Sequence, residues 1–87
     1  MGRLLSLGFE FMGTRQQTLI RVREEEARVE YCITVLNAEL EELLVGNNII
    51  IEENNRLKID MPAQQDEQAM LKKAIATALG KYLNRQL

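Results

Sequence analysis

The chain has no histidine and no tryptophan, and it has only one cysteine, Cys32, and one proline, Pro62. Without histidine it lacks the side chain that most often acts as a general base or metal ligand near neutral pH. One cysteine excludes an intramolecular disulfide, and zinc sites need clusters of cysteine and histidine. The sequence also has no glycine-rich phosphate loop and no calcium-loop spacing. We therefore expect a protein that is not an enzyme and that uses no cofactor.

Basic residues are scarce in the middle of the chain. Residues 24–53 contain nine glutamates and a single base, Arg28, although the whole chain has a net charge of only −2. An acidic centre disfavours nonspecific nucleic-acid binding by that region, because phosphate contacts rely on lysine and arginine. Glu39 and Glu42 lie one helical turn apart, but a charged helix face is usually just solvated. We predict no metal site.

The length of 87 residues predicts a single domain, 1–87. A domain this small buries only about 60% of the surface that its unfolded chain exposes, so self-association is a common supplement. No apolar run approaches the roughly 20 residues that span a bilayer. With one cysteine, a cytoplasmic protein is the expected case. Gly2 and Ser6 match a myristoylation pattern, which leaves modification of Gly2 open.

An alternating pattern opens the chain. Leu5, Leu7, Phe9 and Phe11 are separated by small or polar residues. A period of two residues is typical of a half-buried strand, so residues 4–12 predict a strand that ends at Gly13. The alternative for residues 1–13 is a flexible start.

The next segment, from Thr14 to Gly46, predicts one long helix. Glu24 and Arg28 lie at the favourable i,i+4 spacing on its outer face. Apolar residues recur there at spacings of three and four, which favours a helix packed along a narrow, coiled-coil-like seam. The residues of that seam are Leu19, Val22, Val29, Ile33, Leu36, Leu40 and Leu43.

A second interpretation of residues 18–36 is a β-hairpin. Val29, Tyr31, Ile33 and Val35 alternate, and residues of these types prefer strands. The turn would fall in residues 24–27, Glu-Glu-Glu-Ala, which carry no turn chemistry and favour a helix. We therefore favour the long helix, and the hairpin stays open as the alternative.

A β-hairpin is predicted for residues 46–61, between Gly46 and Pro62. A three-residue loop, 53–55, would place Ile51 opposite Leu57 and Ile49 opposite Ile59 on one apolar face. Ile50 would then point to the other face, where either another part of the chain or a partner subunit would cover it.

A C-terminal helix is predicted after Pro62, with a seam that includes Leu71, Ile75 and Tyr82. The predicted fold class is therefore α+β, in the order strand, long helix, β-hairpin and C-terminal helix (βαββα). A small sheet would carry helices packed along heptad-like seams.

The chain lacks catalytic groups and has apolar seams. Together these two features predict a small non-enzymatic protein that binds proteins or regulates them as a homo-oligomer. We expect its partner or oligomer interface to include exposed apolar residues of the hairpin and the helices. These residues are Ile50, Leu36, Leu40, Leu43 and Tyr82. Neither the partner nor the stoichiometry follows from the sequence.

The alternative function is a nucleic-acid-binding transcriptional regulator that uses the 46–61 hairpin as a wing. Arg56 and Lys58 lie near the tip of that hairpin. The preceding segment carries Glu39, Glu41 and Glu42, which would face phosphates unfavourably. We therefore rank nucleic acid below protein as the partner.

Overall fold

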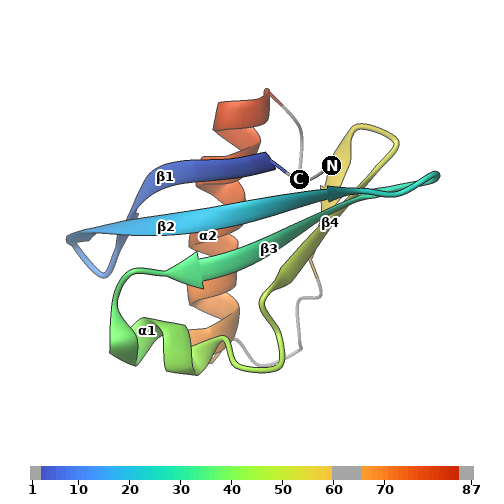
Figure 1. Cartoon of the computed structure of the whole chain (residues 1–87). Helices are drawn as coiled ribbons and strands as arrows, with labels where there is room; N and C mark the ends of the chain where they lie inside the picture. Colours follow the sequence, from blue (N-terminus) through green and yellow to red (C-terminus); the bar gives the residue numbers. More distant parts are fainter. Residues whose placement is uncertain (1–2, 60–65, 85–87) are drawn as a thin grey trace.

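The computed structural model describes residues 3–59 and 66–84, and it shows an antiparallel sheet with helices on one side (Figure 1). The strands follow one another across the sheet in the order β1-β2-β3-β4-β5. Their bounds are β1 Arg3–Phe11, β2 Thr14–Glu24, β3 Val29–Val35, β4 Ile49–Glu53 and β5 Arg56–Lys58. A short helix, α1 (Ala38–Leu43), joins β3 to β4, and the long helix α2 (Glu67–Leu83) follows the sheet.

The predicted βαββα fold is wrong, because the structure has the order βββαββα and no long helix before the hairpin. The segment 14–35 forms β2 and β3, as in the alternative that we ranked second. Ile20 and Ile33 are paired residues on the buried face, whereas Leu19, a member of the supposed helical seam, points to the opposite face. The period of two therefore describes this segment better than the spacing of three and four.

Charged residues close the turn between β2 and β3, so the types of its residues do not indicate a turn. The amide of Glu25 donates to the carbonyl of Arg28 at 2.8 Å. Glu30 lies 2.8 Å from Arg28 and 3.7 Å from Arg23, and Arg23 also lies 3.6 Å from Glu25. This turn is thus held by a backbone hydrogen bond and an ion-pair network rather than by glycine, asparagine or proline.

The predicted register of the β4–β5 hairpin is also wrong. Its loop has two residues, Asn54 and Asn55, which both have positive φ angles, 56° and 62°, as a type I′ turn requires. Leu57 therefore pairs with Glu52 rather than with Ile51. Ile50 is fully buried in the core and Ile49 lies on the opposite face, 40% exposed.

Pairing between β3 and β4 accounts for this register. Ile50 lies opposite Tyr31, so it shares the buried face with the inward residues of β3. Glu52 also points to that face, and it accepts a hydrogen bond of 2.6 Å from the hydroxyl of Tyr31. The sequence of the β4–β5 hairpin alone does not indicate this register, because the register depends on pairing with β3, which lies in another part of the sequence.

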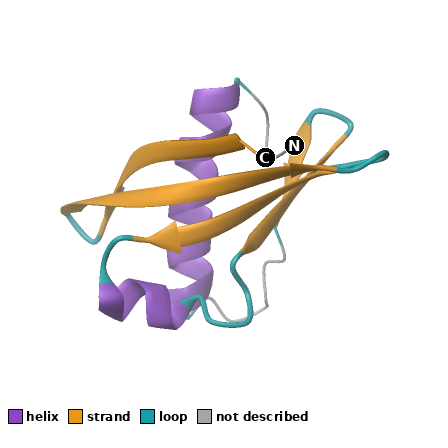
Figure 2. Ribbon diagram, viewed as in Figure 1, coloured by secondary structure: helices purple, strands orange, loops and turns teal. Residues whose placement is uncertain are grey.

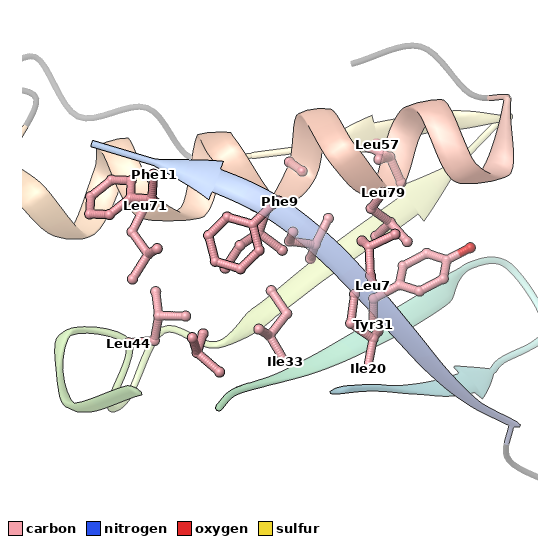
Figure 3. Packing of buried hydrophobic residues seen from close by; sticks show 14 of the residues in the cluster. Leu7, Phe9, Phe11, Ile20, Tyr31, Ile33, Leu44, Leu57, Leu71 and Leu79 are labelled. Atoms are coloured by element: carbon pink, nitrogen blue, oxygen red, sulfur yellow. The ribbon is translucent and has the colours of Figure 1, made fainter. Parts of the chain in front are cut away.

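Helix α2 covers the inner face of the sheet (Figure 2). The carboxylate of Asp66 caps it by accepting from the amide of Ala69 at 2.9 Å, and Asn84 ends it in the left-handed conformation. The helix buries Leu71, Ile75 and Leu79 completely. Figure 3 shows Leu71 and Leu79 beside core residues of the sheet, which include Leu7, Phe9, Phe11, Ile20, Tyr31, Ile33 and Leu57.

Hydrogen bonds fix the first turns of α2 to the end of α1 and to the loop that joins α1 to β4. The side-chain amide of Gln68 donates to the carbonyl of Leu43 at 2.7 Å. The ammonium of Lys72, which is only 5% exposed, donates to the side-chain oxygen of Asn47 at 2.5 Å. These contacts fix the position of α2 along the sheet. They therefore also fix where the other residues on the surface of α2 lie relative to the strands.

The face assignment in β4 predicts opposite outcomes for two neighbouring residues. Ile50→Ala should lower the free energy of unfolding by about 2–5 kcal/mol, because it leaves a cavity in the core. Ile49→Ala, on the half-exposed outer face, should cost less than about 1 kcal/mol. Urea unfolding followed by circular dichroism measures both. Equal losses would contradict the assignment.

Candidate interaction site

An open groove lies between β1 and α2, with a volume of about 1020 Å³. We call it the β1 groove. One wall comes from the edge of the sheet and the other from the flank of the helix that lies beside the core. The groove is lined by Leu7, Gly8, Phe9, Glu10, Arg15, Met70, Lys73, Ala74, Thr77, Ala78, Lys81 and Tyr82.

Strand β1 is an edge strand, and among the described residues no strand pairs with its other side. In antiparallel sheets, residues bonded to one neighbour alternate with residues bonded to the other. The amide of Leu36 donates to the carbonyl of Gln17 at 2.9 Å, so odd-numbered residues of β2 bond toward β3 and even-numbered ones toward β1. Each even-numbered residue of β2 faces an odd-numbered residue of β1. The backbone groups that point to the open side are therefore those of Leu4, Ser6, Gly8 and Glu10.

The two edges of the sheet differ in how they are protected. β5 has only three residues, and Arg56 and Lys58 on it are charged and exposed. Short length and charge are common ways to prevent an edge from pairing with another chain. β1 has nine residues, and Leu4–Phe9 contains no charge. β1 is therefore the edge that is suited to accept another strand.

Helix α2 presents two parallel rows to the groove, because residues four apart lie on the same face of a helix. The first row is apolar: Met70, Ala74, Ala78 and Tyr82. The second is polar and exposed: Lys73, Thr77 and Lys81. Since the alanines are small, they leave space above the helix beside β1.

Arg15 contributes to the sheet side of the groove. Its cross-strand partner is Glu10, but the guanidinium lies against Gly8, where an added Cβ would be 2.6 Å from Nη2. The missing side chain of Gly8 therefore gives the guanidinium its place over the middle of β1.

The groove is positively charged. Arg15, Lys73 and Lys81 outnumber the single carboxylate of Glu10, which gives a net charge of +2 in a chain whose net charge is −2. None of these three cations forms an ion pair with another residue of 3–59 or 66–84. Their charge is thus available to a ligand.

The residues that we predicted for an interface lie in different places. Ile50 is buried in the core, and Leu40 and Leu43 pack in part against it from α1. Leu36 precedes α1 and is 58% exposed. Tyr82, also 58% exposed, lies in the last turn of α2 and lines the β1 groove. The prediction thus contains one residue of the groove and none of β1.

Chemical signals for another kind of site are few. The described residues hold no cluster of three histidine, cysteine, aspartate or glutamate side chains that would suit a metal ion. None of their helices is long and apolar enough to cross a membrane. Comparison with protein-family models, with curated proteins and with solved structures finds no match for the chain.

The contact between Gly8 and Arg15 gives a direct test of the groove geometry. Gly8→Ala should displace the guanidinium, which shifts the Nε–Hε resonance of Arg15 in an NMR spectrum. The free energy of unfolding should change by less than about 1 kcal/mol, because a flexible side chain can move aside and alanine suits a strand better than glycine. Ser6→Ala is the control, since it leaves Gly8 in place, and it should not move that resonance.

Proposed function

We propose that this chain is a non-enzymatic protein–protein interaction module that binds an extended segment of its partner along β1. The observation that carries this proposal is the row of outward backbone groups at Leu4, Ser6, Gly8 and Glu10, beside the apolar row of α2. An extended segment can pair with such an edge as an additional strand. In this mode main-chain hydrogen bonds supply affinity, and pockets for alternate side chains supply specificity.

The position of α2 supports strand addition. A new strand would lie about 4.8 Å beyond β1. There, every second side chain would face the helix, where Ala74 and Ala78 leave space and Met70 and Tyr82 add apolar surface. The groove thus offers both backbone partners and a place for side chains, which a bare sheet edge does not.

The self-association that the sequence predicts stays a proposal in its own right. Light scattering across micromolar concentrations tests it, and a constant monomer mass would contradict it. The nucleic-acid alternative likewise stays a prediction. Arg56 and Lys58 are exposed on the β4–β5 hairpin, but Lys58 lies 3.6 Å from Glu53.

Amide hydrogen exchange tests the proposed function. We would select binders from a library of short random peptides and measure exchange by NMR with and without each peptide. Binding should slow exchange at Leu4, Ser6, Gly8 and Glu10, because their amides gain hydrogen bonds. The intervening odd-numbered amides already bond to β2 and should change less. Binders that protect other surfaces and leave these amides unchanged would contradict strand addition.

A matched pair of substitutions at Ser6 isolates the backbone contribution. Ser6→Pro removes an amide that points to the open side, and proline is tolerated on edge strands at such positions. It should weaken binding of a selected peptide by about tenfold or more, as the loss of a hydrogen bond and of strand pairing implies. Ser6→Ala removes the hydroxyl but keeps the amide, so it should bind as the parent does. Thermal unfolding of both variants verifies that the fold is retained.

A further inference from the structure

We infer that the segment that pairs with β1 is acidic, with carboxylates on the side that faces α2. This inference rests on the proposed function and adds the chemistry of the partner. Its basis is the charge of the β1 groove, which is opposite in sign to the charge of the chain as a whole.

The lysines of α2 set the position of the partner's charges. Lys73 and Lys81 are eight residues apart on one face of the helix, which corresponds to a distance of about 12 Å along its axis. β1 crosses α2 at an angle (Figures 1 and 3), so a strand paired with β1 would also cross the helix. Side chains on the helix side of that strand can carry carboxylates toward Lys73 and Lys81, and an apolar side chain beside them can lie above Ala74 and Ala78.

Arg15 extends the positive charge to the outer side of β1. Its guanidinium lies over Gly8, near the middle of the strand, and it has no ion-pair partner among the described residues. Glu10 is the carboxylate that opposes it in the groove lining. A basic segment would meet cations from both sides of the new strand, so the same groove that favours an acidic partner also disfavours a basic one.

A second copy of this chain fits the groove less well. If two β1 strands paired antiparallel about a two-fold axis, each copy would bring its own Lys73 and Lys81 toward those of the other. Like charges placed together oppose association. Single-stranded nucleic acid matches the positive charge, but its phosphates cannot continue the ladder of backbone hydrogen bonds, and Tyr82 is the one aromatic ring besides Phe9 in the groove lining.

Three peptides that differ only in charge test the inference. Each has the sequence Thr-Xaa-Thr-Val-Thr-Xaa-Thr with blocked ends, where Xaa is glutamate, glutamine or lysine. At low salt the glutamate peptide should bind roughly tenfold more tightly than the glutamine peptide, as two exposed ion pairs allow, and the lysine peptide should bind least. High salt should reduce the difference between them, because exposed charges are screened. NMR titration gives the affinities, and amide exchange locates the bound peptide.

Matched variants connect that preference to the groove. Lys73→Gln combined with Lys81→Gln should remove most of the preference for glutamate over glutamine and leave the affinity for the glutamine peptide unchanged. Lys58→Gln, on the opposite edge of the sheet, should leave the preference intact. Both sites are exposed, so neither variant should unfold the protein.

The outcomes separate this inference from the function on which it rests. If the three peptides bind alike and all protect Leu4, Ser6, Gly8 and Glu10, strand addition stands and the acidic preference is overturned. If neither these peptides nor any peptide from the library protects those amides, both proposals fail. If a short oligothymidylate binds the groove more tightly than the glutamate peptide, the partner is a nucleic acid and the inference is overturned.

Discussion

The packing of α2 against the inner face of the sheet is the constraint on which the rest of this structure depends. Ile20, Ile33 and Ile50 lie in neighbouring strands and are fully buried, in one core with the inward residues of the helix. The described residues provide no other helix of comparable length. Register and strand order must therefore place every inward apolar residue under this one helix, because a slip of one residue would turn them away from it.

Buried polar groups make that arrangement specific. Glu52 points into the core side of the sheet and bonds to the hydroxyl of Tyr31, while Lys72 points inward from α2 and bonds to Asn47. Leaving such groups without partners costs more than a neutral hydrogen bond gains, so they disfavour other registers and other helix positions. The same contacts that position α2 also position its two rows beside β1, and hence the wall of the β1 groove.

Local patterns predicted part of this fold. The alternation in residues 4–12 predicts β1, and the segment after Pro62 predicts a helix, as observed for Glu67–Leu83. The sequence predicts a helix where the β2–β3 hairpin forms, because a backbone hydrogen bond and ion pairs around Arg28 close a turn that its residue types do not indicate. The register of β4 depends on pairing with Tyr31, a contact between segments that the sequence alone does not bring together.

The sequence does not predict the β1 groove for a related reason: the groove exists only where β1 and α2 meet. Alternation marks β1 as a strand, but the strand order decides that it lies at an edge, and the packing of α2 decides which of its rows lies beside that edge. One signal was present in the sequence, since Lys73, Thr77 and Lys81 repeat every four residues next to a row containing Ala74 and Ala78. On such a helix the small alanine side chains leave space beside the charged lysines. Beside the unprotected edge strand β1, this space is where we propose that another chain continues the sheet.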